Sequence, residues 1–150
     1  MPKHLAQLNV GTLVAPVDDP QLAEFVRALD AVNLLAESSE GFVWRLVDED
    51  GRSSTFIAVG DDPQFAINLS VWESLDALRH FTYRSGHSVY LRRRREWFKR
   101  HEGPHLVCWW VDEGHLPTVE EAMARLDALR EKGPTEEAFT LADPFDPPVA

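Results

Sequence analysis

The sequence predicts an α+β fold in which helices cover one face of an antiparallel β-sheet. Stretches of alternating apolar and polar residues, typical of half-buried strands, are separated by stretches whose apolar residues recur every three or four positions, typical of amphipathic helices. Their order is β-α-β-β-α-β with an extra C-terminal helix, which is the ferredoxin-like arrangement. With 150 residues and 44% hydrophobic content, the chain is long enough for one domain, expected at residues 1–142.

The first predicted strand covers residues 5–13, where side chains alternate in character. One face of it would carry Ala6, Leu8 and Val10, and the other would carry Gln7, Asn9 and Gly11. Asp19 can cap a helix, and Pro20 suits the first helical position. Apolar residues at helical spacing continue this helix to about Glu40.

Two further strands are predicted at residues 42–48 and 65–72, with an acidic turn containing glycine after the first of them. In that strand two sets of side chains alternate and would face opposite sides of the sheet: Phe42, Trp44 and Leu46 against Val43, Arg45 and Val47. A short or bent strand is predicted at residues 55–59 and is ended by the Asp-Asp-Pro run that follows.

Two helical segments follow, predicted at residues 75–84 and 87–101, with a break at Ser85 and Gly86. This region is rich in arginine although the net charge of the chain is -10. Four consecutive arginines, 92–95, extend over more than one helical turn and point in several directions. We expect them to pair with acidic elements of the fold or of a partner subunit. We expect no nucleic-acid binding, which depends on cations that neutralise phosphates.

Residues 105–111 are almost entirely apolar and predict a strand in the middle of the sheet. Cys108 is the one cysteine of the chain, so no disulfide forms within it, and no residue nearby in the sequence would lower its pKa. We therefore expect a buried structural thiol. The histidines are not spaced to share a zinc ion, and no phosphate-binding or dinucleotide-binding motif is present.

The C-terminal part is predicted to form a helix, a short strand and a tail. Thr118 and Glu121 match a capping box for a helix that ends before Gly133. A short edge strand is predicted at residues 138–141. Residues 143–150 are rich in proline and have no period, so we expect a tail that is loosely held or lies on a partner.

With helices on one face only, the other face of the predicted sheet would expose aromatic and apolar side chains. A second copy of the chain could bury this exposed face, so we expect a homodimer in which two sheets face each other. No run approaches the roughly 18 apolar residues of a membrane span, and the N-terminus has no apolar leader. A soluble, cytoplasmic protein without membrane contact is expected.

Five segments resemble known proteins: Asn68–Ser74, Tyr83–His87, Arg92–Phe98, Trp109–Val111 and Gly114–Ala122. Together they resemble a bacterial family catalogued as a domain of unknown function within the dimeric α+β barrel superfamily. More distantly, the chain is similar to the antibiotic-biosynthesis monooxygenases and heme-degrading monooxygenases of that superfamily. The resemblance implies a dimer of ferredoxin-like subunits that bind an apolar substrate or heme between sheet and helix.

The heme-degrading relatives use an asparagine of the first strand and a histidine that ligates iron, and Asn9 and His87 match these two by position. The relatives' tryptophan has no counterpart, because the corresponding place falls near His80 and Phe81. Their heme chemistry therefore does not transfer as a whole. The resemblance implies catalytic roles for Asn9 and His87, with His87 as an iron ligand only if heme is bound. Tyr83 lies about one helical turn before His87 on the same side, so a catalytic role is expected for it as well.

The tryptophans are also numerous enough to line a pocket for a flat apolar molecule. The residues expected to contact that molecule are Arg45, Asn68, Trp44, Trp72 and Trp109. Two classes of function stay open. One is a monooxygenase-like enzyme that acts on an apolar or aromatic small molecule, with no cofactor or with heme. The other is a ligand-binding or stress-associated dimer without turnover.

Overall fold

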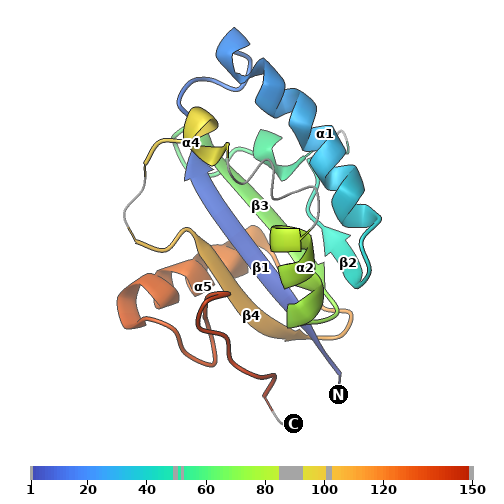
Figure 1. Ribbon diagram of the computed structural model, residues 1–150. Coiled ribbons are helices and arrows are strands. Elements are labelled where there is room, and N and C mark those ends of the chain that lie inside the picture. Colours follow the sequence, from blue (N-terminus) through green and yellow to red (C-terminus); the bar gives the residue numbers. More distant parts are fainter. Residues whose placement is uncertain (1, 49–50, 52, 85–92, 101–102, 149–150) are drawn as a thin grey trace.

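The computed structural model describes residues 2–48, 51, 53–84, 93–100 and 103–148. These residues form a four-stranded antiparallel sheet with the order β2-β3-β1-β4. The strands are β1 (Lys3–Thr12), β2 (Phe42–Arg45), β3 (Phe65–Trp72) and β4 (Leu106–Asp112). The helices are α1 (Ala23–Glu37), α2 (Leu75–Arg84), α4 (Arg94–Trp97) and α5 (Val119–Lys132), with 3-10 turns η1 (Pro20–Leu22) and η2 (Ser54–Phe56). The predicted mixed α+β class is confirmed (Figure 1).

The helix boundaries follow from local capping. The Asp19 carboxylate accepts a hydrogen bond of 2.9 Å from the backbone N–H of Gln21 and starts η1, which leads directly into α1. The Thr118 hydroxyl accepts one of 3.1 Å from the backbone N–H of Glu121 at the start of α5. That helix ends at Gly133, whose φ of 75° is accessible to glycine without a steric penalty. The predicted caps of both helices are confirmed.

The sheet has two chemically different faces, because successive side chains of a strand point to opposite sides. One face, called here the apolar face, is formed by Ala6, Leu8, Val10, Ile67, Leu69, Val71, Val107, Trp109 and Val111. The other, called here the amide face, has polar side chains at its centre: Gln7, Asn9, Asn68 and Ser70. Figure 1 shows α2 and α4 in front of the sheet, and α1, α2 and α4 pack over the amide face.

The prediction that one sheet face is uncovered is wrong for the described residues. The apolar face packs against Leu126 and Leu129 of α5, so helices lie on both faces. Trp109 is 0% exposed within the single chain. The hydroxyl of Ser54 in η2 donates a 2.8 Å hydrogen bond to the Ile67 carbonyl and ties the η2 loop to β3. The homodimer was inferred from an open face that the described structure does not have, and assembly stays a prediction.

The predicted helix at residues 87–101 is much shorter where it is described. Residues 85–92 and 101–102 lie outside the described residues, and α4 ends at Trp97. Phe98 is extended and forms an isolated bridge with Leu13, while the Lys99 N–H donates to the Thr12 carbonyl at 2.8 Å. Backbone pairing with the end of β1 therefore replaces the last helical turn.

Two short strand predictions are also corrected. Residues 54–56 form η2 in place of the start of a strand at 55–59, because Ser53 caps the turn with a hydrogen bond from the backbone N–H of Thr55. In place of the strand expected at 138–141 there are two isolated bridges, one between Thr135 and Ala138 and one in which Phe139 and Cys108 exchange backbone hydrogen bonds of 2.7 and 2.9 Å. A single bridge is enough to bring the C-terminal segment to the edge of β4.

The C-terminal segment contacts the sheet through Phe145. The indole N–H of Trp110 donates to the Phe145 carbonyl at 2.8 Å, and the rings of Phe145 and Phe139 lie 5.9 Å apart. These contacts attach the proline-rich segment at this residue. Among the described helices, none has the length and apolar character to cross a membrane.

Gly11 of β1 allows an aromatic ring to lie directly on the amide face. A β-carbon at this position would lie 2.4 Å from Cδ1 of Phe98 and 3.0 Å from Nη2 of Arg94. The substitution Gly11→Ala should therefore lower the free energy of unfolding by about 1–3 kcal/mol, as overpacking usually does. Urea denaturation measures this.

The same substitution in a Phe98→Leu background isolates the cause, since leucine fills less of the space above Gly11. Gly11→Ala should be less destabilising there than in the wild type. Equal losses in the two backgrounds would contradict a close approach of Phe98 to the strand.

Candidate functional site

A cavity of about 180 Å³ lies between the amide face of the sheet and the helices α1, α2 and α4. Its floor consists of polar strand residues and its walls consist mainly of aromatic and aliphatic side chains. The aromatic residues that line it are Phe25, Phe42, Trp72, Phe81, Trp97 and Phe98. Apolar walls with a few convergent polar groups are typical of small-molecule sites.

A hydrogen-bonded group at the centre of the sheet forms the floor. Gln7 lies opposite Ser70 in the β1–β3 register, two pairs away from Asn68 and on the same face of the sheet. The Gln7 side-chain amide donates to Oδ1 of Asn68 at 2.8 Å and to Oγ of Ser70 at 2.7 Å. Oγ of Ser70 also accepts the indole N–H of Trp72 at 2.9 Å, which leaves its own hydrogen for a further acceptor.

A β-bulge in β2 brings Arg45 to this floor. The register shifts between Phe42 and Trp44, so Phe42 pairs with Trp72, Trp44 with Val71 and Arg45 with Ser70. Phe42 and Arg45 consequently share the amide face, whereas Trp44 packs on the apolar face. The predicted strict alternation, with Phe42 and Trp44 on one side, is wrong because the bulge inserts one residue between them.

Arg45 forms an ion pair, and one of its guanidinium nitrogens has no described partner. Its Nη2 lies 3.0 Å and its Nε 3.1 Å from Oε1 of Glu37, at the end of α1. Its Nη1 is buried and has no hydrogen-bond partner among the described residues. An unpaired buried donor costs about 1–3 kcal/mol, so an acceptor inside the cavity would be favourable here.

Stacked aromatic rings form one wall. The Trp72 ring stacks on Phe81 of α2 at a centroid distance of 5.0 Å and meets the edge of Phe42 at 5.4 Å. At the other end Phe25 of α1 contacts Trp97 at 5.3 Å. Offset and edge-on contacts of this kind restrict ring movement and give the cavity flat, rigid sides.

Asn33 was not predicted as a site residue. It lies on α1, 8% exposed, and lines the cavity among apolar neighbours. Its side-chain amide has no hydrogen-bond partner among the described residues. The signal in the sequence is a polar residue next to Val32, at a position where the helical spacing of apolar residues requires burial.

Arg94 is the second arginine of the cavity and was also missed. Its Nη2 donates to the Val10 carbonyl at 3.0 Å, and its guanidinium carbon lies 4.5 Å from the centre of the Phe98 ring. Burial lowers the pKa of Arg94 from its ordinary value. No carboxylate of the described residues pairs with it. The neighbouring Arg93 instead pairs with Glu24 and Glu96. Within the described residues, the predicted pairing of the arginine run with acidic groups therefore holds for Arg93 but not for Arg94 or Arg95.

The structure separates the predicted site residues into three groups. The residues that line the cavity are Asn9, Arg45, Asn68 and Trp72. Trp44 and Trp109 pack on the apolar face, where the Trp109 indole donates to Glu121 at 3.0 Å, so neither lines this cavity and their contact with a ligand stays a prediction. Tyr83 is 56% exposed and does not line the cavity, although it belongs to α2. His87 lies outside the described residues.

Candidate metal ligands do not cluster in the described part of the chain. No group of three or more His, Cys, Asp or Glu side chains gathers there in a way that could hold a metal ion. The imidazole that lines the cavity belongs to His105, which already takes part in another interaction. Heme binding through His87 stays a prediction from the sequence.

The described residues thus form a small α+β protein with a cavity between its sheet and helices. Residues 4–150 match the family described as a domain of unknown function (DUF3291), and the chain belongs to that family. No curated protein matches it. A solved structure with some similarity is the crystal structure of PA3566 from Pseudomonas aeruginosa, at 14% identity and a TM-score of 0.48, covering 74% of this chain and 94% of that one.

Cys108 lies on the amide side of β4, next to the cavity wall, but is fully buried. Burial raises its thiol pKa to about 12, although the charge of Arg79 acts in the opposite direction. At about pH 8 the native thiol should therefore react very slowly with a disulfide reagent such as DTNB, because the thiolate is the reactive form. In urea one thiol per chain should react rapidly. Stoichiometric reaction of the native protein within the mixing time would show that Cys108 is accessible.

Proposed function

We propose that this protein binds a small, largely apolar or aromatic molecule in the cavity between the amide face and the helices α1, α2 and α4. The observation that carries the proposal is Nη1 of Arg45, a buried donor without a described hydrogen-bond partner, on a residue that lines a largely apolar cavity. Native interiors seldom leave such groups unpaired. A bound molecule with its own donors and acceptors would supply the missing hydrogen bonds.

Other polar groups around the cavity support the same ligand class. Asn9 on the floor and Asn33 on the α1 wall also line the cavity, and neither has a described side-chain hydrogen bond. The three groups come from α1, β1 and β2, elements that are distant in sequence and meet at one cavity. Polar groups on the floor and on one wall, together with aromatic rings, favour a flat molecule with polar atoms on its edges.

We also propose that the fold is the ferredoxin-like arrangement of the dimeric α+β barrel superfamily. The strand order β2-β3-β1-β4 and the position of α1 and α2 over one face support it. In the relatives that the sequence resembles, two sheets face each other across the other face. Here α5 covers that face, so a dimer formed in this way would require α5 to move.

Turnover of the bound molecule by monooxygenase-like chemistry is the second candidate, and the sequence resemblance supports it. The substrate would have to be electron-rich enough to reduce oxygen itself, while the protein holds and orients it. Oxygen uptake with a hydroquinone substrate would test this. Uptake no faster than that with an unrelated protein would leave binding without turnover.

The fluorescence of N-phenyl-naphthylamine, a neutral probe that emits strongly in apolar surroundings, tests ligand binding. The probe should bind the wild type saturably. Ala28→Phe, which places a ring in the cavity, should weaken its binding about tenfold or more, since the space that the probe needs is then filled.

Ala31→Phe is the matched control, because Ala31 lies on the same helix but on its exposed side. That variant should bind the probe as the wild type does, and thermal melting should show that both variants are folded. Absence of saturable binding, or equal loss in the two variants, would overturn the proposed cavity site.

A further inference from the structure

We propose that the ligand of this cavity is an organic anion, an apolar or aromatic body with one acidic group, and that Arg94 binds the acidic group. The inference rests on the proposed function and names its ligand class. The described charged residues that line the cavity are all cationic. Among the described residues, the cavity is lined by Arg45 and Arg94 and by no aspartate or glutamate, although the chain as a whole carries a net charge of -10.

The two arginines differ in how far their charge is already compensated. Glu37 pairs with Arg45, so the positive charge there is largely neutralised. Arg94 has only the Val10 carbonyl and the face of the Phe98 ring as described partners. A guanidinium that is partly removed from water and lacks a counter-ion gains most from an added carboxylate, which it can bind through two parallel hydrogen bonds.

The position of Arg94 is fixed, and this favours recognition. Its hydrogen bond to the Val10 carbonyl and its contact with Phe98 hold the guanidinium over Gly11, where a β-carbon would lie 3.0 Å from Nη2. The missing side chain of Gly11 therefore leaves the space that this arrangement needs. A donor held in place before binding loses little conformational entropy when the anion binds.

A second hollow continues from the cavity at this end and is strongly basic. It is lined by Arg94, Arg95, Phe98, Lys99, Arg100 and His105, and it shares Arg94, Phe98 and His105 with the cavity. Its four arginine and lysine side chains have no ion-pair partner within the described part of the chain.

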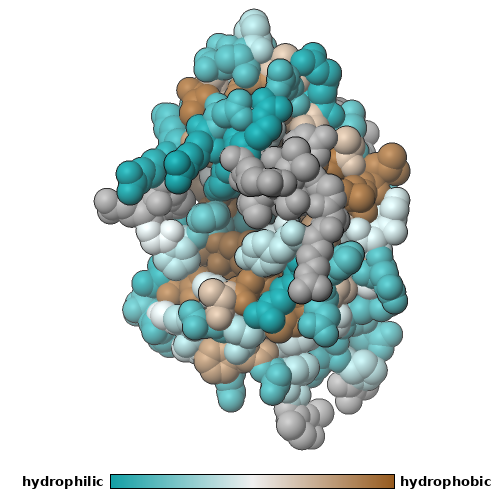
Figure 2. Space-filling model, in the orientation of Figure 1, coloured by the Kyte–Doolittle hydropathy of each residue, from teal (hydrophilic) through white to brown (hydrophobic). Residues whose placement is uncertain are grey.

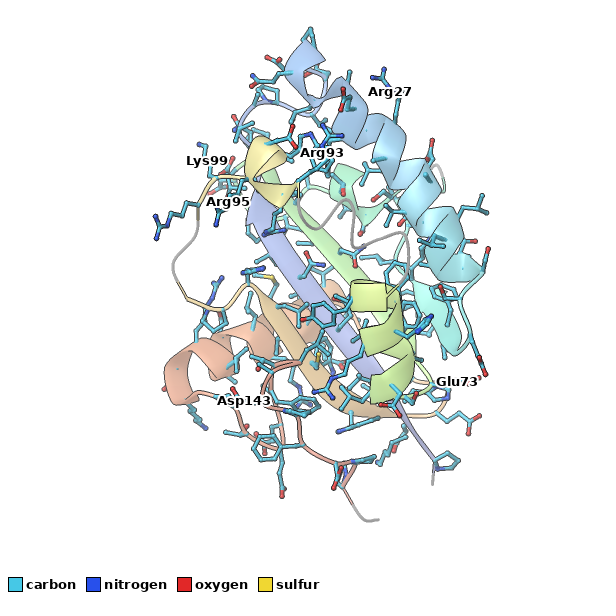
Figure 3. All side chains as sticks on the ribbon, viewed as in Figure 1. Arg27, Glu73, Arg93, Arg95, Lys99 and Asp143 are labelled. Carbon is cyan, nitrogen blue, oxygen red and sulfur yellow. The ribbon has the colours of Figure 1, made fainter. Side chains whose placement is uncertain are left out.

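Figures 2 and 3 show how polar and charged residues lie around α4. In Figure 3, Arg95 and Lys99 lie on the side of α4 away from α1, whereas Arg93 lies between the two helices. Figure 2 shows a mostly hydrophilic surface around α4 and hydrophobic surface lower on the same face. Clustered cations at the opening of a cavity raise the local concentration of anions and speed their association.

Competition against the neutral fluorescent probe tests the inference with two ligands of nearly the same shape, naphthoate and naphthamide. Naphthoate should displace the probe from the wild type at a concentration about tenfold lower than naphthamide, since only naphthoate carries a charge. Arg94→Gln should reduce this preference to about twofold or less while the affinity for the neutral probe changes little.

Arg93→Gln is the matched control, because it removes the same charge from the adjacent residue, which pairs with Glu24 and Glu96 and does not line the cavity. It should keep the preference for naphthoate. Arg94→Lys should keep part of it, which provides a second variant if Arg94→Gln does not fold.

Three outcomes would overturn the inference. Equal displacement by naphthoate and naphthamide in the wild type would show that no anion site exists, while probe binding would still support the cavity. A preference retained in Arg94→Gln but lost in Arg45→Gln would place the anion at Arg45. Failure of the neutral probe to bind would remove the proposed function and the anion site together.

Discussion

The buried row of polar side chains in the middle of the sheet constrains everything that lies above it. Gln7, Asn68 and Ser70 are covered by helices, so their hydrogen-bonding groups must find partners within the fold. Each such bond adds only about 0.5–1.5 kcal/mol net, but leaving one of these groups unpaired costs more. The main effect of these polar residues is therefore to restrict how the side chains around them can be arranged, and their net contribution to stability is small.

That constraint extends to the walls. Ser70 accepts the indole N–H of Trp72 and thereby fixes the plane of a ring on which Phe81 of α2 stacks. Helix α2 consequently packs on aromatic side chains at the end of the sheet. The cavity lies above the polar row next to them. Leucine or valine at Gln7 and Ser70 would favour direct packing of helix on sheet, as on the apolar face around Leu8 and Leu126. Polarity on one face and apolar packing on the other therefore give the two sides different roles.

Charged side chains at the surface and in the cavity also differ in their partners. The chain is acidic overall, and some of the cations described at its surface have carboxylate partners, such as Lys3 with Asp112 and Arg93 with Glu24. Exposed pairs of this kind contribute little to stability, because water and salt screen them. Arg94 lies one residue further along and is instead turned toward the cavity, where burial lowers its pKa and a counter-ion is missing from the described residues. Adjacent arginines can therefore have unrelated roles, because a helix turns by about 100° per residue.

The sequence by itself determined the elements that depend on neighbours along the chain. The caps at Asp19 and Thr118, the strand from residue 65 to 72 and the α+β class follow from local hydrogen bonding and hydrophobic period. The segments that suggested a family of unknown function did so through residues in their linear order. Asn9, Arg45, Asn68 and Trp72 were likewise recognisable as a polar or aromatic set, and all four line the cavity.

Only the tertiary structure decided which side of the sheet each element covers and which polar groups meet. The bulge that turns Trp44 away from Arg45, the packing of α5 on the apolar face and the selection of Arg94 from four arginines all depend on contacts between segments far apart in sequence. Hydrophobic period gives the spacing of buried residues along an element but not the partner that buries them. Asn33 is the clearest case, since a polar residue among apolar helix positions becomes a site residue only when the sheet beneath it leaves a cavity.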